Sequence, residues 1–267
     1  MLKRTLLMLL LLALIMPFQS STIINAQATY DFITAHRGSS GSAPENTLSA
    51  VHQAIAHGAG YAEIDVQLSN DGTIVLYHDQ TLIKLGNPKP ITELTYHEIG
   101  LADAGSWFSP DYVGERIPTL DEVIDLARDR IKLNIELKLY DTDSALPEAV
   151  AFLIDRMDFI EQCIVTSFDE MAIKRVKLLN PGIRTGLIIR NKKTLTNQIW
   201  SSDIDILSVK SKLVNRSLVK KANQNGKELH AWTVNTKKEM RRMLRYEVKS
   251  VITDYPELLY SMMKFRT

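Results

Sequence analysis

The sequence has one cysteine, Cys163, among 267 residues. A single thiol excludes an intramolecular disulfide and a zinc site built from cysteines. Cys163 is followed by Ile164 and Val165, a pattern that favours an inert thiol in a buried strand. We therefore expect packing, rather than covalent cross-links, to stabilise the folded chain.

The sequence also lacks a typical membrane-spanning segment, which needs about 20 consecutive apolar residues. The apolar run at residues 6–16 is too short, so a membrane anchor is the less favoured alternative. This run follows Lys3-Arg4 and precedes the small residues Ala26-Gln27-Ala28. The order of a basic segment, a short apolar segment and a small-residue cleavage site is typical of a secretory signal peptide. We predict cleavage after residue 28 and a secreted, periplasmic or otherwise extracytoplasmic location.

Neither sign of charge is in large excess, with 32 Lys and Arg residues against 31 Asp and Glu residues. Cleavage after residue 28 removes two basic residues and no acidic one, which changes the net charge from +1 to −1. Without a polybasic region, the chain has no strongly positive potential that would attract nucleic acid or an anionic membrane surface. We expect neither nucleic-acid binding nor stable membrane insertion.

Short apolar runs alternate with helical patterns along the rest of the chain, as in parallel sheets with helical crossovers. Strands are expected at residues 32–35, 61–68, 74–77, 132–139, 163–166, 183–189, 206–209, 228–233 and 250–252. Helices are expected at 46–57, 120–129, 145–157, 170–179, 193–200, 215–225, 237–246 and 256–263. About eight strand-helix units in roughly 240 residues favour a closed (β/α)8 TIM barrel over an open sheet.

No linker divides residues 29–267, so we predict one barrel domain. The irregular stretch at about 79–118 contains Gly86, Pro88, Pro90 and Gly105. It is predicted to be a small insertion after the second strand region.

Two predicted strands carry carboxylates at alternate positions. Glu63 and Asp65 share one face of the first, and Glu136 shares a face with Asn134 and Lys138 in the second. Both faces of a barrel strand are covered, so these carboxylates point inward, where like charges require compensation. Three carboxylates suit one divalent cation, with Ca²⁺ the first candidate and Mg²⁺ the second. The alternative is an internal salt bridge from Glu136 to Lys138 or Arg37 without metal.

Two histidines stand at predicted strand ends. His36 lies in Ala35-His36-Arg37-Gly38, and His78 follows the predicted strand at 74–77. Active sites of such barrels lie at the carboxyl ends of the strands. Two imidazoles there can share proton transfer, and Arg37 can bind an anion. The other histidines, His52, His57, His97 and His230, are expected to be surface or packing residues.

Eight motifs resemble the glycerophosphodiester phosphodiesterase family and occur in that family's order. They are His36-Arg37-Gly38, Pro44-Glu45-Asn46-Thr47, Glu63-x-Asp65, His78-Asp79, Gly114-Glu115-Arg116-Ile117-Pro118-Thr119-Leu120, Glu136-Leu137-Lys138, Trp232-Thr233-Val234-Asn235 and Thr253-Asp254-Tyr255-Pro256. The resemblance implies a (β/α)8 barrel with an inserted subdomain. It also implies hydrolysis of glycerophosphodiesters to sn-glycerol 3-phosphate and an alcohol.

The resemblance further implies roles for individual residues. His36 and His78 would be the acid/base pair. The metal ligands would be Glu63, Asp65 and Glu136, and the phosphate contacts Arg37 and Lys138. Glu45 and Asn46, from the second motif, are predicted substrate contacts.

Apolar side chains are also candidates for substrate contact. Phe168, Trp232 and Trp107 could form a wall beside the glycerol or head group, or could simply be core residues. The chain departs from the family at Ile83-Lys84-Leu85-Gly86, where many members have an Arg-Thr-Thr-Gly-like run. This departure affects how the insertion covers the pocket, and therefore substrate preference.

The predicted function is a secreted, metal-dependent phosphodiesterase acting on small glycerophosphodiesters, with teichoic-acid or lysolipid fragments as further candidate substrates. One alternative is a lysophospholipase D-like enzyme, which would need an apolar rim, although the sequence has no amphipathic cationic helix to supply one. Another is a non-catalytic surface binding protein on the same barrel. The presence of both histidines and all three carboxylates argues against the second alternative.

Overall fold

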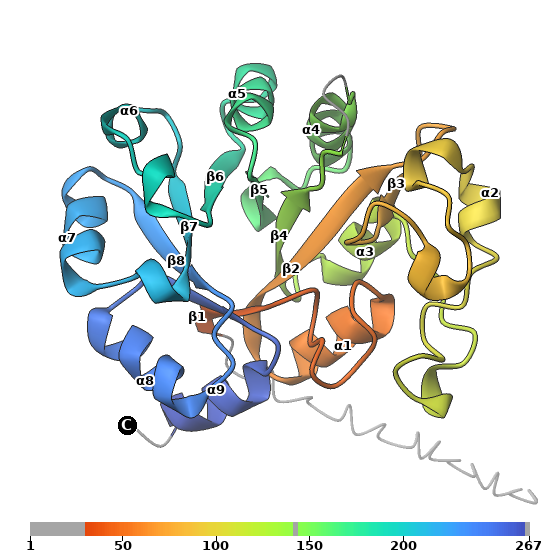
Figure 1. The fold of residues 1–267 in the computed structure, drawn as a ribbon, viewed down its shortest axis with the longest axis horizontal. Coiled ribbons are helices and arrows are strands. Elements are labelled where there is room, and N and C mark those ends of the chain that lie inside the picture. The colour runs from red at the N-terminus through yellow and green to blue at the C-terminus, as the bar shows by residue number, and fades with distance from the viewer. Residues whose placement is uncertain (1–29, 141–143, 265–267) are drawn as a thin grey trace, which may run out of the picture.

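The computed structural model of the chain describes residues 30–140 and 144–264 (Figure 1). The predicted signal peptide, residues 1–28, lies outside the described residues. Within them, no helix combines the length and the apolar character needed to cross a membrane.

Eight parallel strands of the described chain close into a barrel, which confirms the predicted (β/α)8 fold. The strands are β1 (Tyr30–Ala35), β2 (Ala59–Leu68), β4 (Lys132–Leu137), β5 (Cys163–Ser167), β6 (Arg184–Ile189), β7 (Ile206–Lys210), β8 (Glu228–Trp232) and β9 (Ser250–Thr253). The barrel closes because β1 pairs with both β2 and β9. The first and last strands of the described chain are therefore neighbours.

Helices lie outside the strands (Figure 1). They are α1 (Leu48–Ala56), α3 (Leu120–Ala127), α4 (Leu146–Arg156), α5 (Glu170–Leu179), α6 (Asn197–Trp200), α7 (Arg216–Gln224), α8 (Lys237–Tyr246) and α9 (Pro256–Lys264). The short helical stretch expected near 193–200 is present but interrupted. A single 3₁₀ turn, Lys192–Thr194, precedes the four-residue α6, because Leu195 and Thr196 leave the helical conformation between them.

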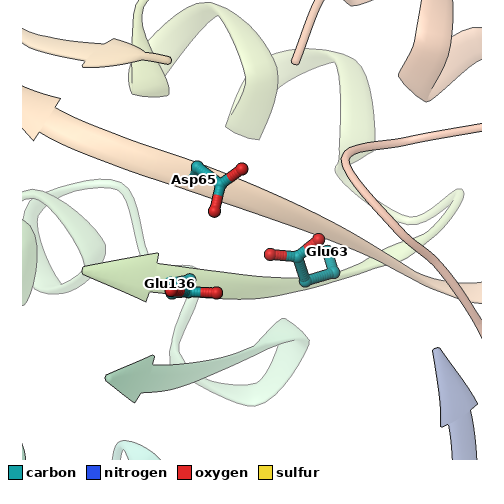
Figure 2. Close-up of side chains that lie close together, drawn as sticks. All are labelled: Glu63, Asp65 and Glu136. Atoms are coloured by element: carbon teal, nitrogen blue, oxygen red, sulfur yellow. The ribbon is translucent and has the colours of Figure 1, made fainter. Parts of the chain in front are cut away.

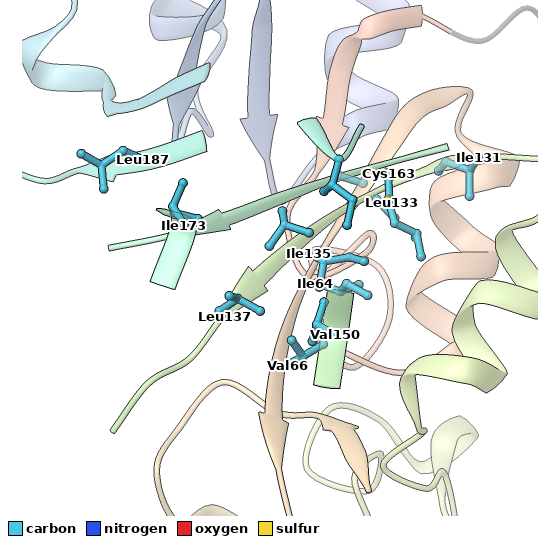
Figure 3. Packing of buried hydrophobic residues seen from close by; sticks show 14 of the residues in the cluster. Ile64, Val66, Ile131, Leu133, Ile135, Leu137, Val150, Cys163, Ile173 and Leu187 are labelled. Atoms are coloured by element: carbon cyan, nitrogen blue, oxygen red, sulfur yellow. The ribbon is translucent and has the colours of Figure 1, made fainter. Parts of the chain in front are cut away.

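The main core lies between the strands and the outer helices. Ile64 and Val66 of β2, Ile135 of β4 and Val150 of α4 are buried in one hydrophobic cluster (Figure 3). These strand residues alternate with the inward-facing carboxylates, since successive side chains of a strand point to opposite faces. Cys163 belongs to the same cluster, and burial raises the pKa of its thiol to about 12. The thiol is therefore protonated at neutral pH.

Strand β3 (Ile74–Leu76) lies outside the parallel barrel and pairs antiparallel with the end of β2. Strand β2 continues past the barrel, and the tight turn at Ser69–Thr73 brings the chain back until Leu76 lies opposite Val66. Both histidines follow strands and line one cavity, as expected, but β3 runs antiparallel to β2 whereas β1, before His36, runs parallel to it. His78 reaches the mouth of the barrel because β3 runs back toward it.

The insertion, residues 79–118, contains the short helical segments Ile83–Leu85, Ile91–Glu93, α2 (Tyr96–Ile99) and Pro110–Tyr112. It packs around a second hydrophobic cluster that includes Val75 of β3 together with Leu82, Leu94 and Ile117. The insertion lies beside the barrel on the side of α2 in Figure 1. A small subdomain thus covers the region next to β3.

Candidate active site

Three carboxylates meet at the carboxyl end of β2 and β4. Strand pairing places Asp65 opposite Glu136 and Glu63 opposite Asn134. Glu63, Asp65 and Glu136 are all buried, and each offers an oxygen within 4.8 Å of the others (Figure 2). The structure therefore brings together the three predicted metal ligands.

Two cations already contact part of this group. Lys138 Nζ lies 2.9 Å from Asp65 Oδ1 and 2.5 Å from Glu136 Oε1, and Arg37 Nε lies 3.4 Å from Asp65 Oδ2. Burial raises the pKa of Asp65, but Lys138 and Arg37 outweigh that effect and lower it below its usual range. The Glu136–Lys138 pair of the alternative interpretation is thus present, whereas Arg37 pairs with Asp65 and not with Glu136.

Glu63 is the least compensated of the three carboxylates. Its Oε2 accepts a hydrogen bond of 2.8 Å from the Arg37 backbone N–H, while its buried Oε1 has no hydrogen-bond partner within the described chain. Burial, followed by the charge of Asp65, raises the pKa of Glu63. An unpartnered buried oxygen beside two other carboxylates suits a divalent cation, so these residues could hold a metal in addition to the ion pairs.

The loop between β1 and α1 arranges the carboxylates. Arg37, Gly38 and Asn46 all have positive φ angles, of 55°, 75° and 58°. This conformation places the buried Asn46 against Asp65, where Asn46 Nδ2 donates to Asp65 Oδ2 at 2.9 Å and the Asp65 N–H donates to Asn46 Oδ1 at 3.0 Å. Asn46 therefore orients a carboxylate, and its predicted substrate contact stays a prediction.

His36 lies at the end of β1 and is oriented from the other end of the chain. Its Nδ1 is 2.6 Å from Asp254 Oδ1, after β9, and its Nε2 is 4.0 Å from Glu63 Oε2. Asn235 holds Asp254, since its Nδ2 donates to Asp254 Oδ2 and its Oδ1 accepts from the Asp254 N–H. Burial lowers the pKa of His36, but Asp254 and Glu63 outweigh it, so the net shift is upward.

His78 lies on the opposite side, after β3. Its Nδ1 is 2.7 Å from Asp79 Oδ1, and its backbone carbonyl accepts a hydrogen bond from Tyr140. The side-chain amide of Gln67 donates to the carbonyls of Tyr77 and Asp79, on either side of His78. Burial lowers the pKa of His78. The two imidazoles thus have oppositely shifted pKa values.

The site cavity, about 200 Å³, opens between these groups. Among the predicted site residues, it is lined by His36, Arg37, Glu63, His78, Glu136, Lys138, Phe168 and Trp232. Phe168 and Trp232 meet edge to face with centroids 5.7 Å apart, and the guanidinium of Arg190 lies 4.8 Å above the Phe168 ring. One side of the cavity is therefore charged and the other aromatic.

Three residues that were candidates for substrate contact lie outside the site cavity. Glu45, Asn46 and Trp107 line a separate insertion cavity of about 380 Å³, between the barrel and the insertion. Glu45 Oε2 bonds to Arg37 Nη1 at 2.9 Å, so Glu45 contacts the site cavity only through Arg37. The buried His230 is paired at 3.5 Å with Glu228 inside β8.

Asp254, Asn235 and Gln67 were missed as functional residues. Asp254 and Asn235 belong to recognised motifs, but no sequence spacing shows that β9 lies beside β1. Gln67 shares the inward face of β2 with Glu63 and Asp65. Its place in this alternating pattern was the only feature of the sequence that indicated a role at the site. All three position other groups at the site.

Comparison with known proteins agrees with this geometry. Residues 36–258 match the model of the glycerophosphoryl diester phosphodiesterase family. The chain is 36% identical over 233 residues to the Bacillus subtilis protein YhdW, named for this activity, covering 85% of the chain and 96% of YhdW. It is 34% identical over 242 residues to a glycerophosphodiester phosphodiesterase of Caldanaerobacter subterraneus, covering 87% and 97%.

A solved structure is similar as well. It is an Oleispira antarctica phosphodiesterase in complex with its product sn-glycerol 3-phosphate, 29% identical, with a TM-score of 0.78 and coverage of 87% of this chain and 96% of that one. The match spans the barrel and the motifs that build its site. The chain belongs to the glycerophosphoryl diester phosphodiesterase family.

Proposed function

We propose that this member of a family of phosphodiester hydrolases hydrolyses glycerophosphodiesters to sn-glycerol 3-phosphate and an alcohol, using His36 and His78 and one divalent cation. The observation that carries the proposal is the meeting of three buried carboxylates, two imidazoles and two cations at the mouth of the barrel. The product bound to the Oleispira antarctica relative supports the same reaction.

Glu63, Asp65 and Glu136 would hold the cation, with Ca²⁺ the first candidate and Mg²⁺ the second. When bound there, a divalent cation polarises a phosphate oxygen and lowers the pKa of a nearby hydroxyl or water. Arg37 and Lys138, which both line the site cavity, would bind the phosphate and offset its charge in the transition state.

One histidine would remove the proton of the nucleophile and the other would protonate the departing alkoxide. Asp254 fixes the ring of His36, and Asp79 that of His78, through their Nδ1 atoms. This leaves both Nε2 atoms available for proton transfer. The nucleophile is water, or the glycerol 2-hydroxyl in a route through a cyclic phosphate.

A head-group panel tests this function. Hydrolysis of glycerophosphocholine, -ethanolamine, -glycerol and -inositol would be measured beside lysolipid and teichoic-acid fragments, each with chelator, Ca²⁺ or Mg²⁺. We expect release of glycerol 3-phosphate from at least one glycerophosphodiester, only with metal. A Glu63→Gln, Glu136→Gln double variant is the matched inactive control. No hydrolysis of any member with either metal would refute the proposal.

We also propose that the protein is exported and cleaved after Ala28. The support is the basic and apolar N-terminal pattern with its small-residue cleavage site. Fractionation of expressing cells, with sequencing of the mature N-terminus, tests this. Recovery of the intact chain from the cytoplasm alone would contradict it.

A further inference from the structure

The geometry points to the insertion cavity as a binding subsite for an apolar chain carried by the diester substrate, an inference that rests on the proposed function. The cavity measures about 380 Å³. Its walls come from both the barrel side and the insertion: Leu76, Tyr77, Leu85, Ala104, Trp107 and Ile117. A ligand pocket is commonly a mostly apolar cavity of about 300–1,000 Å³ beside a few polar groups.

Two sets of ion pairs and one pair of neighbouring residues place this cavity beside the reaction site. Glu45 lines the insertion cavity and bonds to Arg37, which lines the site cavity. Tyr77 lines the insertion cavity, and the next residue, His78, lines the site cavity. Asp79 contacts both His78 and the Lys84 ammonium, at 2.7 Å each. A substrate held at the site thus lies next to the insertion cavity.

The chemistry of the walls selects an apolar occupant. The carboxylate of Glu45 is paired with Arg37, the ammonium of Lys84 with Asp79, and the amide of Asn46 with Asp65. The Trp107 indole N–H donates to the Ala104 carbonyl at 2.8 Å. The charged groups of the wall are therefore already paired, and a cationic or anionic head group would find no charged partner that is not shared; the Tyr77 hydroxyl makes no hydrogen bond within the described residues.

The outer surface of the insertion continues this character. Trp107 is 56% exposed, and Ile83, which precedes the cavity residues Lys84 and Leu85, is 65% exposed. The apolar wall of the cavity thus reaches the surface of the insertion at Trp107, whereas Ile83 does not line the cavity.

The apolar chain could belong to the leaving alcohol or to the glycerol, and substrates distinguish the two. One series is sn-glycero-3-phosphate esters of ethanol, butanol, hexanol and octanol. The other is glycerophosphoethanolamine against its short-chain monoacyl forms, kept below their critical micelle concentrations. Burial of a methylene is worth up to about fourfold in kcat/KM, so the preferred series should gain on the order of 10- to 100-fold over four methylenes.

Two variants of opposite kind locate the subsite. Ala104→Leu fills the cavity and Trp107→Ala removes part of its wall, and both should bring the ratio of long-chain to short-chain kcat/KM toward one. Val113→Ala, at an exposed insertion residue that does not line the cavity, is the matched control and should retain the ratio. Thermal unfolding checks that each variant is folded. If Ala104→Leu does not fold, the Trp107→Ala result alone decides whether the subsite exists.

The outcomes separate this inference from the proposed function. If the wild type cleaves no member of the head-group panel and neither series with metal present, the proposed function fails. If it cleaves a glycerophosphodiester but shows no chain-length gain in either series, the subsite alone is overturned. A gain that survives in the folded cavity variants also overturns it, because the chain must then bind elsewhere.

Discussion

His36 and His78 reach the carboxylates from different elements, and each has its own acidic partner. If they are the proton-transfer pair, replacing either with Ala should lower kcat by about 10²–10⁴-fold, with a smaller change in KM. The two losses should not add in the double variant, because one failed proton transfer leaves the other little to assist. Steady-state kinetics on a cleaved glycerophosphodiester measures this.

A substrate with a nitrophenyl leaving group separates the two roles. This leaving group needs little protonation, so the ester should restore activity to the variant that lacks the acid and not to the one that lacks the base. His52→Ala and His97→Ala are the controls and should stay within a few-fold of wild type. Near-normal turnover by both His36→Ala and His78→Ala would exclude the pair.

Asp254 acts on the reaction only through His36 and is therefore a positioning residue. Replacement by Asn preserves the shape of the side chain but removes its negative charge. In the wild type, that charge favours a proton on Nδ1 and raises the pKa of His36. We expect Asp254→Asn to lower kcat by about 10–100-fold, with KM little changed. The acid or base limb of the pH–rate profile that belongs to His36 should move to lower pH. An unchanged profile would mean that Asp254 is only structural.

At the scale of elements, the β1–α1 loop depends on Gly38. A Cβ at this position would lie 2.6 Å from the backbone carbon and Cβ of Ala50, and φ is +75°. Gly72, in the β2–β3 turn, has a similar φ of +80°, but a Cβ there would have no such neighbour within 4 Å. Both changes to Ala carry the cost of a left-handed backbone, about 1–2 kcal/mol, but only Gly38→Ala adds a clash.

Urea unfolding should therefore show a loss for Gly38→Ala that exceeds the loss for Gly72→Ala by about 1–3 kcal/mol. Gly38→Ala should also lower activity, because the same loop places Arg37 and Asn46 against the carboxylates. Equal losses for the two variants would show that the loop can move away from α1 without cost.

The elements also show what sequence reasoning can and cannot reach. The alternation around Glu63, Asp65 and Glu136 revealed the inward face, because burial on both sides of a strand makes an inward charge conspicuous. The antiparallel direction of β3 follows from its short connection to β2, which contains Asp71-Gly72, because parallel strands need a crossover of a dozen or more residues. The pairing of His36 with Asp254 depends on contacts between segments that are distant in the sequence, and so does the insertion cavity. The spacing of residues along the chain does not reveal such contacts.

At the scale of the whole molecule, the proposed metal site predicts that stability depends on a divalent cation. We expect EDTA to abolish activity and lower Tm, and Ca²⁺ or Mg²⁺ to restore both. A cation that binds only the folded state adds about 2.7 kcal/mol of stability at a hundredfold excess over Kd. Full activity of exhaustively chelated protein would refute the site.

Glu63→Gln is the matched variant for this experiment. It retains the volume of the side chain and removes one of the three like charges, so the metal-free variant should be at least as stable as the metal-free wild type. Its stabilisation by Ca²⁺ should be smaller because one ligand charge is lost. Calorimetry with and without metal measures both effects. An unchanged Ca²⁺ effect would exclude Glu63 as a ligand.

The closure of the barrel by β1 against β9 also has a consequence for synthesis. His36 and Asp254 are 218 residues apart, and β9, which brings them together, is the last strand of the described residues. A growing chain on the ribosome, or one cut short before β9, has neither a closed barrel nor an oriented His36. His36 therefore gains its acidic partner only when β9 has paired with β1.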